Sequence, residues 1–142
     1  MDALKEIVDY GVIGLLLVLG VVACGVAVER WRYFQRVDPA EFQHREALEI
    51  ALTKHLVVIG TIAANAPYIG LLGTVLGIML TFHTMGASGA LAVATIMVGL
   101  SLALKATAVG LLVAIPCVVM NNALRRRVSE LISLYKAQQQ HG

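Results

Sequence analysis

Residues 56–82 read LVVIGTIAANAPYIGLLGTVLGIMLTF, a run of twenty-seven positions without a charged side chain. About twenty apolar residues in a helix span a hydrocarbon core of roughly 30 Å. The run therefore predicts a transmembrane helix. Because it is longer than the bilayer requires, the helix must tilt or continue out of the membrane, and we expect it to continue into the cytoplasm.

Two further runs carry the same signal. Residues 11–28 hold no charge, and residues 91–122 hold only Lys105. The chain is 58% hydrophobic and 14% charged, whereas soluble domains are about half apolar and about a quarter charged. The sequence predicts an all-α integral membrane protein, one membrane domain over residues 1–142. Its predicted parts are spans at about 11–28, 56–82 and 91–120, a connector at 29–55, a turn at 83–90 and a tail at 121–142.

The basic residues predict the orientation. They gather beside the cytoplasmic ends of transmembrane helices. The turn at 83–90 holds none, and the segment before the first span holds only Lys5. The N-terminus and the turn are therefore expected outside and the C-terminus inside, with helices two and three extending into the cytoplasm. The basic residues of the connector and tail are Arg30, Arg32, Arg36, Arg45, Lys54, Arg125, Arg126, Arg127 and Lys136.

The first run has an alternative interpretation as a cleaved signal peptide, since residues 21–24 (VVAC) resemble a lipoprotein cleavage site. Signal peptides begin with positive charge, whereas acidic residues outnumber Lys5 before this run. We therefore interpret it as a span. Cys24 and Cys117 both lie in apolar runs and are expected to be packing residues rather than a disulfide.

The segments outside the spans are also expected to be helical. Asp38-Pro39 is typical of a helix start, which predicts a helix from Ala40 to His55 that runs into the second span. Beyond Asn122, five apolar residues recur at helical spacing among charges. They predict an amphipathic extension of the third helix. The five are Leu124, Val128, Leu131, Ile132 and Tyr135.

Catalysis needs titratable groups gathered at a site, and the three spans hold no Asp, Glu or His. The histidines, His44, His55, His83 and His141, lack metal-ligand spacing. Residues 70–77 (GLLGTVLG) contain glycines, but no Gly-Lys-Ser/Thr follows them as in a phosphate loop. We expect no enzyme activity, cofactor, metal or nucleic-acid partner.

Small residues instead form stripes on the second and third helices, where they let helix backbones approach closely in lipid. The stripes serve either packing within one chain or packing between copies as well, and their length favours the second interpretation. The predicted packing and oligomer-interface residues are Gly70, Gly73, Gly77, Gly99, Ala103, Ala106 and Gly110.

Thr74 and Thr107 are the polar residues that stand out within these faces. A helical threonine often bonds only a carbonyl of its own helix. Alternatively, both hydroxyls line a lumen and face something inside it.

Two stretches resemble the signatures of the MotA/TolQ/ExbB proton-channel family. They are residues 65–79 (NAPYIGLLGTVLGIM) and residues 103–116 (ALKATAVGLLVAIP). The resemblance is strongest to the branch that energises the TonB system. It implies a homopentamer in the bacterial inner membrane, around a pore that holds the helices of an ExbD-like single-span partner. It further implies that this partner supplies a membrane aspartate and that proton flow drives a TonB-like protein.

The resemblance also assigns residues. Thr74 and Thr107 match the family's pore threonines and would face the partner's aspartate. The family often has a glutamate where this chain has Leu102, which leaves a proton role for the third helix itself open. A TolQ-like role in the Tol-Pal system and a passive scaffold or channel without proton coupling are the alternatives.

Lys105 is the one charge inside the spans, and a lysine at the bilayer centre costs about 2.5–3.5 kcal/mol. Helical rotation places it about 200° from Thr107, so it turns away from any lumen that Thr107 faces. It either reaches toward the cytoplasmic headgroups or contacts a neighbouring subunit or an anionic lipid, and an interface or lipid role is favoured over direct proton transfer.

Overall fold

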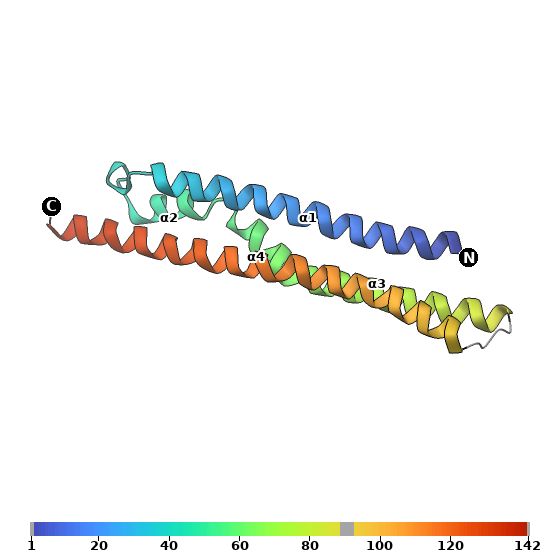
Figure 1. Cartoon of the computed structure of the whole chain (residues 1–142). Coiled ribbons are helices and arrows are strands. Elements are labelled where there is room, and N and C mark those ends of the chain that lie inside the picture. Colours follow the sequence, from blue (N-terminus) through green and yellow to red (C-terminus); the bar gives the residue numbers. More distant parts are fainter. Residues whose placement is uncertain (1, 89–92, 142) are drawn as a thin grey trace.

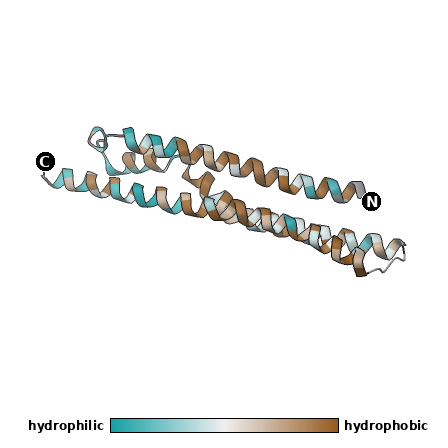
Figure 2. Cartoon of the chain, in the orientation of Figure 1, coloured by the Kyte–Doolittle hydropathy of each residue, from teal (hydrophilic) through white to brown (hydrophobic). Residues whose placement is uncertain are grey.

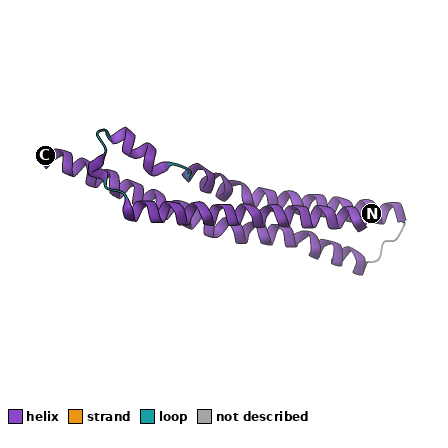
Figure 3. Cartoon of the chain, turned by 90° about the horizontal axis from the view of Figure 1, so that it is seen from above, coloured by secondary structure: helices purple, strands orange, loops and turns teal. Residues whose placement is uncertain are grey.

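Four α-helices and one short 3-10 helix make up the computed structural model, which describes residues 2–88 and 93–141 (Figure 1). The described segments carry no strand, and their loops occur in the part of the sequence that connects α1 to α3 (Figure 3). The predicted all-α class is confirmed. The elements are α1 (Asp2–Arg36), η1 (Pro39–Glu41), α2 (Arg45–Thr53), α3 (Leu56–Ser88) and α4 (Val93–His141).

Three of the helices, α1, α3 and α4, are long and apolar enough to cross a membrane. α3 and α4 pack along each other, and α1 lies alongside the pair (Figure 1). The 49 residues of α4 correspond to roughly 74 Å, far more than a bilayer needs. The hydrophilic residues concentrate at the end where α4 outreaches α3, and the apolar residues along the rest (Figure 2).

The C-terminal part of α4 buries the apolar stripe predicted for the tail. Leu124, Val128, Leu131, Ile132 and Tyr135 all lie in one cluster with Leu48 and Leu52 of α2. The predicted amphipathic extension is therefore confirmed. Its partner is the short helix of the connector, which covers it from the side.

The connector differs from the expected single helix running from Ala40 into the second span; that prediction was wrong. Asp38 does cap a helical turn, because its carboxylate accepts a 3.0 Å hydrogen bond from the Ala40 amide, but the turn ends at Glu41. α2 then ends at Thr53, and His55 takes a left-handed backbone conformation with φ of 66°. This break lets α2 leave the axis of α3 and bury its leucines against α4.

The bounds of the long helices also differ from those of the runs. α1 begins at Asp2 and so includes the acidic lead, and α3 continues as helix to Ser88, through most of the segment expected as a turn. Residues 89–90 of that segment lie outside the described residues. Of the two cysteines, Cys117 is buried as expected, whereas Cys24 is exposed.

Candidate functional site

The backbones of α3 and α4 touch directly at Gly70 and Gly110. A methyl group on Gly70 would lie 3.1 Å from the Gly110 Cα and 2.7 Å from the Ala106 carbonyl oxygen. A methyl group on Gly110 would lie 2.7 Å from the Ala66 carbonyl oxygen. Only glycine fits at both positions, because a side chain there would push the two backbones apart.

The other small residues continue this seam along both helices. A methyl group on Gly73 would lie 2.8 Å from the Cβ of Ala106, and one on Gly77 would lie 3.0 Å from the Cβ of Ala103. Further along, Gly99 packs against Thr81. All seven predicted stripe residues are buried within one chain, which agrees with both interpretations. Contacts between copies stay a prediction, and they require other faces of the helices.

Thr74 and Thr107 meet within this seam, and their hydroxyl groups share a hydrogen bond. The Thr74 hydroxyl also lies 3.0 Å from the Ala103 carbonyl oxygen on α4 and 3.3 Å from the Gly70 carbonyl oxygen on its own helix. Thr74 is thus bonded across the helix pair, and not only to its own backbone. The close glycine contact at Gly70 is what brings the two hydroxyls within reach.

The donors in this cluster can be counted. A threonine hydroxyl donates one hydrogen and has two acceptor lone pairs. If Thr74 donates to the Ala103 carbonyl, its nearer carbonyl partner, then Thr107 donates to the Thr74 oxygen. The Thr107 oxygen then keeps lone pairs free to accept a hydrogen from outside. Rotation of both hydroxyls reverses the order, so the pair can present either an acceptor or a donor.

The exposed edge of Thr107 faces away from α1. Thr74 is 6% exposed, whereas Thr107 is half-buried. Val109 packs against the cluster of Leu16, Ala66 and Ala114, to which α1 contributes Leu16, and Thr107 lies about 200° around α4 from Val109. The open edge of the threonine pair therefore faces the side of the helix pair that α1 leaves uncovered, among exposed apolar residues such as Leu71, Leu104 and Leu111.

Lys105 is exposed, and none of the ion pairs in the described part of the chain involves it. Leu102, at the family's glutamate position, is 43% exposed. The described residues contain no group of three or more His, Cys, Asp or Glu side chains able to hold a metal.

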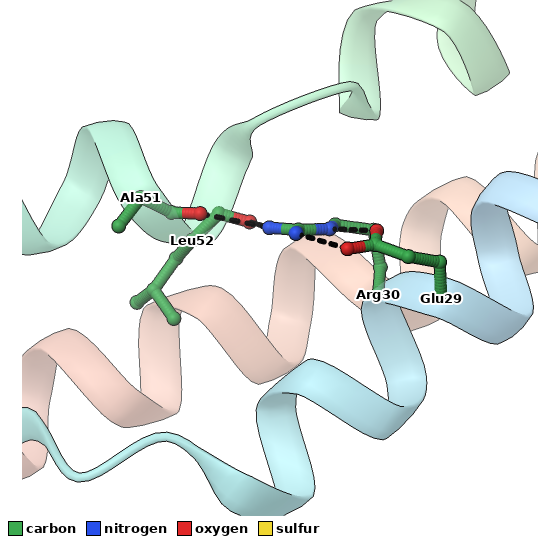
Figure 4. Close-up of polar contacts among 4 residues, drawn as sticks. All are labelled: Glu29, Arg30, Ala51 and Leu52. Atoms are coloured by element: carbon green, nitrogen blue, oxygen red, sulfur yellow. Dashed lines mark hydrogen bonds and ion pairs between the residues drawn. The ribbon is translucent and has the colours of Figure 1, made fainter.

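A buried arginine, which sequence analysis counted only as a basic residue of the connector, ties α1 to α2 (Figure 4). Arg30 is 3% exposed, and its guanidinium donates 2.8 Å and 3.4 Å hydrogen bonds to the carbonyl oxygens of Ala51 and Leu52. It also pairs with Glu29 and lies over the Tyr33 ring. A cation at the C-terminal end of a helix satisfies carbonyls that have no helical partner.

The same contact sets the electrostatics of the connector. Glu29 directly follows the predicted span at 11–28. The hydrogen bond from Arg30 lowers the pKa of the Glu29 carboxyl, partial burial opposes this, and the nearby positive charges lower the pKa further. Glu29 therefore stays ionised beside Arg30. The pair marks the level at which the apolar part of α1 ends.

Comparison with known proteins identifies the class of protein. The sequence profile of the MotA/TolQ/ExbB proton channel family matches residues 26–137. The chain therefore belongs to this family, whose members are membrane channels and not enzymes.

Within the family, the chain is 48% identical to the biopolymer transport protein ExbB of Aquifex aeolicus over 137 residues, 96% of this chain and 93% of the relative. It is 48% identical to ExbB of Helicobacter pylori strain J99 over 133 residues, 94% of this chain and 91% of the relative. The Tol-Pal system protein TolQ of Pseudomonas aeruginosa is 39% identical over 87 residues, 61% of this chain and 38% of the relative.

Proposed function

We propose that this chain is the ring-forming subunit of a proton-driven motor that energises nutrient import through a TonB-like protein. The observation that carries the proposal is the hydroxyl pair of Thr74 and Thr107. It lies in the α3–α4 seam and opens on the side away from α1. Similarity to ExbB along nearly the whole chain supports the TonB branch over the TolQ branch, which matches a shorter part of the chain.

In the proposed complex, the chain crosses the bacterial inner membrane three times, with its N-terminus outside and its C-terminus inside. Five copies surround a pore, with the open edge of the threonine pair toward the lumen. The exposed apolar residues around that edge then contact the transmembrane helix of an ExbD-like partner. The remaining exposed apolar faces of α1, α3 and α4 then contact neighbouring copies and membrane lipids.

The threonine pair then acts on the partner's aspartate through reversible hydrogen bonding. A protonated carboxyl donates to the Thr107 oxygen while Thr107 donates to Thr74. When the carboxyl loses its proton, rotation of the hydroxyls lets Thr107 donate to the carboxylate instead. The pair thus stabilises both protonation states of the aspartate in a place that excludes water, without itself carrying a charge.

The test of this function is partner dependence. The complex is purified in detergent from cells with and without the ExbD-like gene, and its mass is compared with siderophore-dependent growth of the same cells. We expect the purified complex to have a larger mass when the partner is present than when it is absent. We also expect siderophore-dependent growth only when the partner is present. Growth that is indifferent to loss of the partner would support a passive channel or scaffold. Dependence of outer-membrane integrity, rather than of growth on siderophores, would support the TolQ-like role.

A further inference from the structure

The inference concerns Asp9, whose carboxylate oxygen Oδ1 is buried and has no hydrogen-bond partner among the described residues. Asp9 lies on α1 and faces the α3–α4 seam, because a methyl group on Gly77 would lie 3.9 Å from this oxygen. A buried carboxylate oxygen without a partner is costly, and the cost is higher in an apolar surrounding. A donor or a cation is therefore missing from its surroundings.

The register between α1 and α4 identifies a cation at the same level. A methyl group on Gly20 would lie 3.6 Å from Val113, and the two helices run in the same direction (Figure 1). Asp9 lies eleven residues before Gly20, and Leu102 lies eleven residues before Val113. Asp9 and Leu102 therefore lie at the same level along the two helices. The common neighbour Gly77 gives the same result, since it packs on both Asp9 and Ala103.

Lys105 is placed to reach this level. It lies one helical turn before Val109 and on the same face of α4, and Val109 packs in the cluster around Leu16 of α1. Long side chains on a helix lean toward its N-terminus, which directs the Lys105 stem back toward the level of Leu102. Lys105 is exposed, and none of the ion pairs among the described residues includes it.

We propose that Asp9 and Lys105 of the same chain form an ion pair that holds the N-terminal half of α1 against α4. Lys105, the one charged residue within the predicted third span, is then paired with a carboxylate of opposite charge. The pair also fixes α1 beside Gly77, about one turn from Thr74, so it acts as a positioning contact for the seam. This proposal concerns the folded chain and does not depend on which machine the chain belongs to.

Crosslinking tests the geometry. The full-length Asp9→Cys/Lys105→Cys protein, in a Cys24→Ser/Cys117→Ala background, is treated in its membranes with a short bis-maleimide. We expect one linker joining both thiols of a single chain, read as the intact mass of the monomer. The matched control is Asp9→Cys/Leu104→Cys, because Leu104 is exposed and lies about 140° around α4 from Val109. The control should give no link within a chain.

Thermal unfolding of the detergent-purified protein tests the energetics. Asp9→Asn and Lys105→Met should each lower Tm by about 5 °C, and the double variant should lose no more than the larger single loss. The exchanged pair, Asp9→Lys/Lys105→Asp, should recover part of the loss. The proposal requires both results. A crosslinked dimer would assign Lys105 to a neighbouring copy. Absence of the link, or additive decreases in Tm, would mean that Lys105 contacts lipid. Each of these outcomes overturns the proposed ion pair.

Discussion

Gly70 of α3 and Gly110 of α4 lie so close that a methyl group on either would come within 3.1 Å of the other's Cα atom. This contact sets the spacing of the whole seam and brings the hydroxyls of Thr74 and Thr107 together. The seam therefore has a structural part, the glycines, and a chemical part, the threonines, and the two can be tested separately.

The structural part predicts a clash in Gly110→Ala. The new methyl group would meet the Ala66 carbonyl oxygen at 2.7 Å, and because backbone atoms cannot move aside cheaply, the variant should lose about 1–3 kcal/mol of unfolding free energy. The measurement is thermal unfolding followed by circular dichroism in detergent. Gly25→Ala is the matched control, since nothing lies within 4 Å of its added methyl group, and it should be neutral or stabilising. Equal stability of the two variants would show that the seam is loosely packed.

Arg30 predicts a different effect at the end of α1 that packs against α2. Arg30→Ala leaves the carbonyl groups of Ala51 and Leu52 without their buried donor and should cost about 2 kcal/mol. Loosening of α2 should also speed tryptic cleavage after Lys54. Arg32→Ala, which removes an exposed guanidinium on the same helix, should change stability by less than about 0.5 kcal/mol. Cleavage of Arg30→Ala at the wild-type rate would mean that other contacts hold α2 in place.

The basic residues of the connector and tail predict the membrane topology. A reporter that works only outside the cytoplasm should be active when fused near Ser88 and inactive when fused near Arg36 or after Gln140. The opposite pattern would invert the orientation, and activity at Arg36 would overturn the positive-inside assignment.

Much of the fold could be predicted because apolar runs and helical spacing are properties of the sequence itself. The buried stripe of the α4 extension, from Leu124 to Tyr135, follows directly from its period. The connector could not be predicted in the same way. Its break depends on His55 in a left-handed conformation, which a non-glycine residue adopts rarely and only where tertiary contacts favour it.

The candidate site was predictable in its residues but not in its contacts. Small residues serve packing within a chain and packing between chains equally well, so the sequence could not say that Gly73 and Ala106 meet within one chain. Asp9 was overlooked because it lies just before an apolar run, where it resembles an end marker. Only the register of α1 on α3 shows that its carboxylate lies against Gly77.

The central claim is that the hydroxyls of Thr74 and Thr107 serve the partner's membrane aspartate, and energy-dependent siderophore uptake measures it most directly. The double variant Thr74→Val/Thr107→Val keeps the shape of both side chains and removes both hydroxyls. We predict normal insertion and oligomer size with uptake reduced to background. Thr107→Ser, which keeps the hydroxyl, and Thr95→Val, which removes an exposed hydroxyl elsewhere on α4, should retain uptake. Wild-type uptake by the double valine variant would contradict the claim and reduce the threonine pair to a packing contact between α3 and α4.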